Sequence, residues 1–320
     1  MNIKRQNIEY TLSPSVKVSF LSVTNLAPHY HVTDLEIVYC FKGKVTLTSA
    51  FETITLSEGE YFTVSRYDIH SIQGDGDNIL MTVHLDLTSA AIPWQELKTF
   101  LFVFESMDSE KRQEFNSASK KVNDILMLMG LLSSNGASHE TLLEPASDKL
   151  LALLTNHFSY ANYACQKLEL PEGITDIFTK MSQYIYHHYS EKISLSTFAE
   201  SLNFSKSRIA SMVKNSLNLT FNYALNYVRC FHAEHLLLTT DKSNLDISNE
   251  CGFSDSKYFY HHFKKWYGRT PNQHKEWYES HMKKADEYNE IPPAILKPFI
   301  ENYYCKYHSE KTIAYIKAGK

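Results

Sequence analysis

The chain has 320 residues, of which 43% are hydrophobic and 13% aromatic, and its formal net charge is −4. This length favours two domains, and the composition excludes an intrinsically disordered protein. The five cysteines are scattered without a C-x-x-C pair, which argues against a zinc finger or a disulfide framework. No stretch approaches the ~20 apolar residues of a membrane span and the first residues lack an apolar signal region, so we expect a cytoplasmic protein without a membrane partner.

Residues 1–90 have the pattern of a small all-β domain. Short segments rich in Val, Ile, Thr, Tyr and Phe alternate with turn residues around Gly43, Gly59 and Gly76. This spacing predicts an antiparallel barrel or sandwich. The expected strands are Val16–Val23, Glu36–Phe41, Val45–Ser49, Tyr61–Ser65 and Ile79–Leu87.

From about residue 92 the apolar residues recur every three or four positions, which predicts amphipathic helices. Residues 92–170 are expected to form a helical linker or dimerisation segment that completes a first domain, 1–170. Pro171 and Gly173 mark the boundary to a second domain, 174–280, and residues 281–320 form an extension without an assigned role. The expected helices are Trp94–Ser106, Glu110–Leu132, Ser147–Ala164, Ile174–Tyr189, Thr220–Thr239 and Ile295–Tyr304.

The second domain contains the same short unit twice. Each copy reads as a short apolar helix, a tight turn and a second helix with its own apolar stripe. Ala199 and Ser248 are 49 residues apart, whereas Ile209 and Phe259 are 50 apart, so the second turn has one extra residue. This layout predicts two helix-turn-helix units, at about 193–215 and 244–266.

The segment between the two units predicts a single connecting helix. Its 20 residues, Thr220–Thr239, would span about 30 Å at ~1.5 Å per residue. Successive major grooves on one face of DNA lie ~34 Å apart, so this helix has the length to hold two recognition helices in neighbouring grooves. Charge supports this interpretation weakly: residues 174–280 carry 12 Lys and Arg against 10 Asp and Glu, and the remainder carries 20 against 26.

The segment Ile247–Pro271 has the features of a known signature. Gly252 permits a positive φ in the turn, Ser254 stands where it can cap the recognition helix, and Gly268 can end that helix in a left-handed conformation. On these residues the C-terminal domain resembles the DNA-binding domain of the AraC/XylS family of bacterial transcription regulators. The resemblance implies double-stranded DNA as the partner, and a regulator, usually an activator, that also contacts RNA polymerase.

Contacts to DNA are expected from the exposed faces of the two recognition helices. Long side chains such as those of Arg208, Lys257 and His261 can reach guanine or phosphate acceptors, whereas the alternative for each residue is a solvated surface position. The candidates are Ser205, Lys206, Ser207, Arg208, Ser211 and Lys214 in the first unit, and Ser254, Ser256, Lys257, Tyr260, His261 and Lys264 in the second.

The N-terminal half resembles the cupin-like sensory domain that often precedes this DNA-binding domain. His29, His31, Glu36 and a later His70 have the spacing of metal-binding cupins. We expect these four residues to converge at one mouth of the barrel and to line a pocket for a polar small-molecule effector, with no bound metal and no cofactor. A divalent metal site and a purely structural polar cluster are the alternatives.

The predicted fold class is therefore α+β with two domains: an N-terminal antiparallel cupin-like β-barrel with following helices, and a C-terminal all-α tandem helix-turn-helix. We expect an effector-responsive, sequence-specific transcription regulator, not an enzyme. The resemblance further implies a homodimer, paired through the helices after the barrel. The alternative function is a metal-dependent cupin enzyme fused to a nucleic-acid-binding module.

Overall fold

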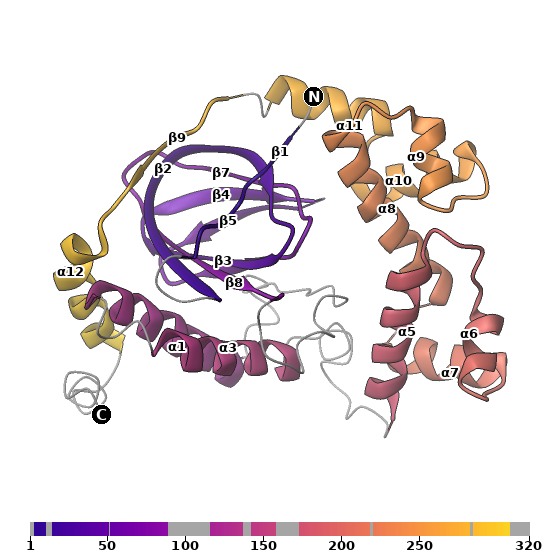
Figure 1. Cartoon of the computed structure of the whole chain (residues 1–320), viewed down its shortest axis with the longest axis horizontal. Coiled ribbons are helices and arrows are strands. Elements are labelled where there is room, and N and C mark those ends of the chain that lie inside the picture. Colours follow the sequence, from indigo (N-terminus) through magenta and orange to yellow (C-terminus); the bar gives the residue numbers. More distant parts are fainter. Residues whose placement is uncertain are drawn as a thin grey trace.

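The structure, a computed structural model, describes residues 3–10, 15–50, 52–88, 116–136, 142–157, 173–217, 220–281 and 284–307. The N-terminal part is a nearly closed antiparallel barrel, drawn in indigo and purple in Figure 1. Its strands follow the order β5-β4-β7-β2-β8-β3-β6. They are β1 (Lys4–Arg5), β2 (Val16–Tyr30), β3 (Asp34–Lys42), β4 (Lys44–Ser49), β5 (Glu52–Ser57), β6 (Tyr61–Val64), β7 (His70–Gln73) and β8 (Ile79–Asp86).

The barrel confirms the predicted fold class and corrects its details. Strand β2 continues seven residues beyond the predicted end at Val23 because it changes partners: residues 16–21 pair with β8 and residues 25–29 pair with β7. Strands β5 and β7 were not predicted. The first alternates polar and apolar residues, which is itself the pattern of a half-buried strand and could have been predicted. The second, His70–Gln73, is only four residues long with little apolar content, so its sequence offers little pattern.

Two helices, α1 (Asn116–Ser134) and α3 (Leu143–His157), pack against one face of the barrel (Figure 1). The apolar stripe on α1, including Leu126, Met129 and Leu132, is buried in one core with Phe41 and Met81 of the barrel. The apolar stripe of α1 is therefore part of the core of its own chain. The predicted helix Trp94–Ser106 and the ends of the predicted helices at 110–115 and 158–164 lie outside the described residues.

The C-terminal extension returns to the barrel. Strand β9 (Glu287–Glu290) pairs antiparallel with Leu21–Val23 of β2, and the backbone N–H of Ile291 donates to the carbonyl of Phe20 (2.8 Å). Leu21 pairs with both Leu80 and Glu290, so β9 occupies the edge of β2 opposite β8. Pairing this edge removes a row of free backbone donors and acceptors, which would otherwise attract another strand.

After β9 the chain forms α12 (Pro293–Tyr307), which confirms and extends the predicted helix Ile295–Tyr304. Leu296, Ile300 and Tyr303 lie in the core shared by the barrel, α1 and α3. The hydroxyl groups of Tyr303 and Tyr39 are 3.4 Å apart inside this core. The extension is therefore part of the N-terminal unit, although it follows the second domain in sequence (Figure 1).

The C-terminal domain is all-α, as predicted. It consists of α5 (Ile174–His188), α6 (Leu195–Ser201), α7 (Lys206–Leu217), α8 (Phe221–Thr239), α9 (Asn244–Glu250), α10 (Ser256–Tyr267) and α11 (Pro271–His281). Helix α8 contributes Phe221, Leu225 and Val228 to the core around α5–α7. Its second half contributes Cys230, Ala233 and Leu237 to the core around α9 and α10.

The last turns of α8 also contact the barrel. Leu238 is fully buried against Ile3 and Ile69, and its carbonyl accepts a hydrogen bond from the backbone N–H of Ile3 (3.1 Å). The ring of His235 lies 4.5 Å from that of Tyr30 and 5.5 Å from that of Tyr67. The barrel and the helical domain are thus in contact at α8 as well as connected by the chain. Within the described residues no helix has the length and apolar character needed to cross a membrane.

Substitution on α12 tests whether the extension belongs to the barrel. Ile300 is 1% exposed, so Ile300→Ala should lower the free energy of unfolding of the barrel by ~2–5 kcal/mol, because it leaves a cavity in the shared core. Ile295 is 68% exposed on the same helix, and Ile295→Ala should change it by less than ~0.5 kcal/mol. Equal effects in urea denaturation would show that α12 is only loosely attached.

Candidate nucleic-acid interface and barrel site

The first helix-turn-helix unit consists of α6 and α7, each with a capped N-terminus. Ser194 caps α6, since its hydroxyl accepts from the N–H of Thr197 while the Thr197 hydroxyl accepts from the N–H of Ser194. Ser205 precedes α7, and its hydroxyl accepts from the backbone N–H of Arg208 (3.3 Å). A side-chain cap satisfies one of the free donors of the first turn, so α7 begins at a defined residue.

The second unit is α9 and α10, and here one prediction was wrong. Asp255, not Ser254, caps the recognition helix, because the Asp255 carboxylate accepts from the N–H of Tyr258 (2.7 Å). Ser254 lies one residue earlier, with its hydroxyl 3.4 Å from that carboxylate. The additional residue found in the second turn accounts for the shift, since it moves the start of α10 to 50 residues after that of α7.

Both turns contain a residue with positive φ at equivalent positions. Gly252 has φ +76°, as predicted, and Asn203, 49 residues earlier, has φ +58°. Asn is the non-glycine residue that tolerates this conformation best. At Gly252 a side chain is also excluded by space, because a Cβ would lie 2.6 Å from the carbonyl oxygen of Ser190. Gly268 ends α10 with φ +67°, also as predicted.

Arg229 of α8 holds the second turn against the end of α5. Its Nε donates to the carbonyl of Tyr189 (2.7 Å), and its Nη2 donates to that of Glu191 (2.9 Å). The guanidinium lies 5.8 Å from the ring centre of Phe253, the residue that follows Gly252. Arg229 is only 8% exposed, so these contacts are shielded from solvent. They fix the position of the second helix-turn-helix unit relative to α5.

The structure leaves most of the predicted DNA contacts exposed. Lys206, Ser207, Arg208, Ser211 and Lys214 are exposed along α7. On α10, Lys257, His261 and Lys264 are exposed and Ser256 is half-buried. The exception is Tyr260: it packs against the core, and its hydroxyl accepts from the Asn244 amide (2.7 Å). Tyr260 therefore faces α9 and is a poor candidate for a base contact.

Sequence reasoning missed Tyr258. The starts of α7 and α10 differ by 50 residues, so Tyr258 stands where the first unit has Arg208. Tyr258 is 40% exposed and lines a surface hollow together with Asp255, Ser256, Lys257 and His261. The 50-residue offset between the two units is the signal in the sequence that identifies Tyr258.

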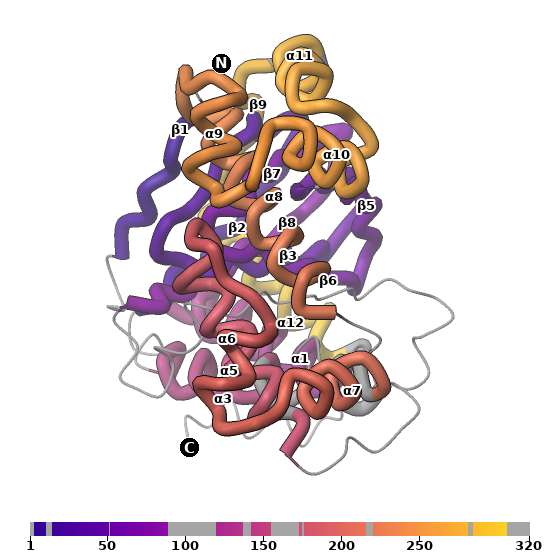
Figure 2. The backbone as a smooth tube through the Cα atoms, turned by 90° about the vertical axis from the view of Figure 1, so that its right-hand side faces the viewer, coloured from indigo at the N-terminus to yellow at the C-terminus, as the bar shows by residue number. Residues whose placement is uncertain are grey.

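The connecting helix forms close to its predicted length. Its 19 residues, Phe221–Thr239, rise about 29 Å at ~1.5 Å per residue. Thr220 caps it, since its hydroxyl accepts from the N–H of Tyr223 (3.2 Å). Figure 2, viewed from the helical side, shows α7 and α10 toward opposite ends of α8.

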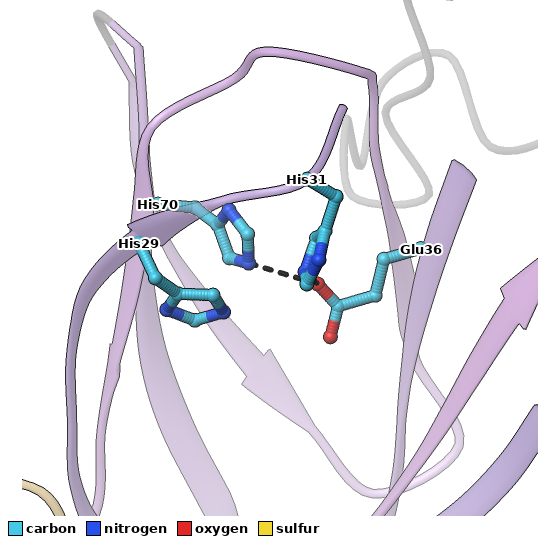
Figure 3. Close-up of side chains that lie close together, drawn as sticks. All are labelled: His29, His31, Glu36 and His70. Atoms are coloured by element: carbon cyan, nitrogen blue, oxygen red, sulfur yellow. Dashed lines mark hydrogen bonds and ion pairs between the residues drawn. The ribbon is translucent and has the colours of Figure 1, made fainter. Parts of the chain in front are cut away.

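Within the barrel the structure brings together His29, His31, Glu36 and His70, whose ligand atoms all lie within 4.8 Å of one another (Figure 3). Strand register explains this. His29 of β2 pairs with His70 of β7, and Glu36 of β3 pairs with His84 of β8. His31 Nε2 is 3.1 Å and His70 Nε2 is 2.8 Å from the same oxygen of Glu36. All four residues are at most 8% exposed.

His84 is a fifth member that spacing did not reveal. Its Nε2 lies 3.9 Å from the other Glu36 oxygen, and its ring is 4.9 Å from that of His31. Burial lowers the pKa of His84 to about 3 and lowers that of His29 well below its usual value. Burial alone would raise the pKa of Glu36, but the rings of His70 and His84 and the hydrogen bonds hold it well below the usual range. An ionised carboxylate therefore faces imidazoles of which at least two are neutral.

Comparison with known proteins supports the assignment of the helical unit. A family model described as "Helix-turn-helix domain" matches residues 198–276. The chain is 25% identical over 262 residues to the HTH-type transcriptional activator RhaS of Salmonella arizonae, which covers 76% of this chain and 86% of RhaS. The helical region carries an AraC-type helix-turn-helix domain.

Another relative and one solved structure match at lower identity. An uncharacterized HTH-type transcriptional regulator of Staphylococcus aureus (strain COL) is 23% identical over 246 residues, or 76% of this chain. The chain spans only about a third (32%) of that relative. Among solved structures, ToxT of Vibrio cholerae O395 covers 84% of this chain and all of its own, at 13% identity and a TM-score of 0.40.

The conformation of the second turn gives a testable prediction at Gly252. Gly252→Ala should destabilise the helical unit by more than Gly268→Ala, because both positions have positive φ but only the first also places a Cβ against backbone. We expect ~1 kcal/mol for Gly268→Ala and at least ~2–3 kcal/mol for Gly252→Ala, measured by thermal unfolding. Equal losses at the two positions would mean that the close approach at Ser190 is relieved without difficulty.

Proposed function

We propose that the protein is a sequence-specific DNA-binding transcription regulator that reads two neighbouring major grooves with α7 and α10. The observation that carries the proposal is their common support on α8, which lies in both hydrophobic cores. Two capped helices with exposed polar faces, supported by the same helix, would form a complete two-site reader within one chain. The AraC-type domain supports DNA as the partner.

Different contacts are expected from the two helices. On α7 the guanidinium of Arg208 lies 4.5 Å from the ring centre of Phe204, an arrangement that orients it while leaving its donors free for guanine or phosphate. The neighbouring Ser207 and Ser211 are short, so the long donors of α7 are Arg208 and the two lysines Lys206 and Lys214. On α10, Lys257, Tyr258 and His261 offer a larger set, and DNA occupies the hollow that they line.

The barrel is proposed as the sensor of this regulator, and its buried cluster of His29, His31, Glu36 and His70 as the effector site. The support is direct contact between units: Tyr30 and Tyr67 of the barrel touch His235 of α8. An effector that prefers one arrangement of this contact shifts the position of the DNA-binding unit. We further propose that the protein is cytoplasmic and activates transcription through RNA polymerase. These proposals rest on the resemblance to AraC/XylS regulators alone.

Homodimerisation is also proposed from the resemblance. The apolar face of α1 is already buried in the core of its own chain, so a partner subunit would have to bind elsewhere. A single chain carries both recognition helices, and DNA binding therefore does not by itself need a dimer.

Selection of bound duplexes from a random library by the full chain tests the DNA proposal. We expect a motif with two blocks whose centres lie about one helical turn, ~10 bp, apart, because α8 fixes the spacing of the recognition helices. A motif with a single block would mean that only one unit reads DNA, and recovery of no motif would contradict sequence-specific binding.

Substitutions in the recognition helices should then separate base from phosphate contacts. Arg208→Ala and Lys257→Ala should each weaken binding to the selected site by ~1–3 kcal/mol and relax preference in one block only. Lys180→Ala removes the same charge from α5, where Lys180 pairs with Asp176, and should leave affinity within a factor of about two. If all three substitutions weakened binding equally, the contacts assigned to α7 and α10 would be wrong.

A further inference from the structure

The two recognition helices differ at one equivalent position near their starts. Arg208 is the third residue of α7, and Tyr258 is the third residue of α10. The backbone N–H of each donates to the side chain that caps its helix, that of Ser205 (3.3 Å) or Asp255 (2.7 Å). Because the helix starts and the caps correspond, the two side chains leave their helices at the same point of the first turn.

Each of these two side chains is held by an aromatic neighbour. The guanidinium of Arg208 lies 4.5 Å from the ring centre of Phe204. The ring of Tyr258 lies 4.3 Å from that of His262, one turn further along α10, in a T-shaped arrangement. The Tyr258 hydroxyl also accepts from the side-chain amide of Asn226 of α8 (3.3 Å), a residue that is 4% exposed. The hydroxyl end of Tyr258 is therefore anchored at α8.

The anchored side chain of Tyr258 lines the hollow at the start of α10. Asp255, Ser256, Lys257 and His261 line the same hollow. Since the hydroxyl of Tyr258 is engaged by Asn226, the part available to DNA is the carbon ring. A tyrosine has only two side-chain torsions, and here both ends of the ring are in contact with protein, so little conformational freedom is lost on binding.

An aromatic ring and a guanidinium select different groups in the major groove. Arginine donates two N–H groups to O6 and N7 of guanine. The C5-methyl group of thymine is the apolar feature of the groove, and apolar side chains, including aromatic ones, contact it. The ring of Tyr258 thus suits a thymine methyl group in the way that the guanidinium of Arg208 suits guanine.

The charge of Asp255 favours a base over a phosphate in this part of the hollow. The Asp255 carboxylate is exposed and lies beside Tyr258, to whose N–H it is bonded. A phosphate against this carboxylate would bring two negative charges together, which is unfavourable at short range. A base edge carries no net charge, so it is the better occupant next to Tyr258.

We propose that Tyr258 sets the base preference of the second block by packing its ring against the C5-methyl group of a thymine. Arg208, at the equivalent position of the first unit, binds guanine. This inference rests on the proposed DNA-binding function and names the base that its second reader selects. The two blocks of the site then differ at equivalent positions, so the chain distinguishes them and binds in one orientation.

Replacement of thymine by uracil tests the methyl contact, because uracil has the same pairing edge and lacks only the C5-methyl group. On the duplex selected by the full chain, uracil at one position of the second block should weaken binding ~4-fold, the effect of removing one methyl-sized group from an apolar contact. Tyr258→Ala should bind the thymine and uracil duplexes equally. Uracil at thymines of the first block is the matched control, and its effect should be the same for wild type and Tyr258→Ala.

Two further variants separate the ring from the hydroxyl. Tyr258→Phe keeps the ring and should keep the preference of wild type for thymine over uracil. Tyr258→Arg should change the preferred base at that position from thymine to guanine and leave the first block unchanged. Circular dichroism and an unchanged preference in the first block show that each variant is folded.

Equal affinity of wild type for the thymine and uracil duplexes at every position of the second block would overturn the methyl contact. Loss of the thymine preference in Tyr258→Phe would also overturn it, because the hydroxyl would then be the reading group. Both outcomes are measured on a recovered motif, so they are distinct from failure of the DNA proposal itself. Recovery of no motif would overturn that proposal and this inference together.

Discussion

Helix α8 is the element on which both functional regions depend. Its first half packs with α5–α7, its second half packs with α9 and α10, and Leu238 near its end is buried against the barrel. Arg229 at its middle binds the carbonyls of Tyr189 and Glu191. A single helix thus supports both α7 and α10 and carries the contact with the barrel, so a movement of α8 against the barrel would move both helices together.

A second constraint is that the chain returns to the barrel after the helical domain. Because β9 pairs with β2 and α12 lies in the core with α1, the chain that follows α11 is held against the barrel. Asn25 and the backbone N–H of Ala27 also bind Ala285 and Asp286 just before β9 (2.8 Å each). The Ala27 segment accepts from His29 as well, so the tail and the histidine cluster share a neighbour.

Much of the fold and of the candidate site could be predicted from sequence where local patterns determine structure. The repeat with one extra residue predicted both helix-turn-helix units, the positive φ of Gly252 and the left-handed end at Gly268, because those features follow from residue type and spacing. The spacing of His29, His31, Glu36 and His70 selected residues that do lie together. Their assigned roles, and those of the DNA contacts, are still proposals.

The features that the sequence could not show depend on contacts between residues that are far apart in the chain. His84 joins the cluster only because β8 pairs with β3 in a register that places it opposite Glu36. The tail has no marker in its own sequence for the strand of the barrel that it joins. The capping residue of α10 was misassigned because Ser254 and Asp255 are both good caps, and the backbone geometry of the turn decides between them. The contact of the Tyr260 hydroxyl with Asn244 lies across two helices, so the sequence could not show it.

The most direct measurement of the central claim, that α8 fixes the spacing of the two recognition helices, is the affinity of the full chain for its selected site after insertion of 5 bp between the two blocks. Half a turn places the second block on the opposite face of the duplex. A rigid α8 predicts that affinity falls to that of a site with one block destroyed. Unchanged affinity for the lengthened site would contradict the claim, because it would show that α7 and α10 move independently.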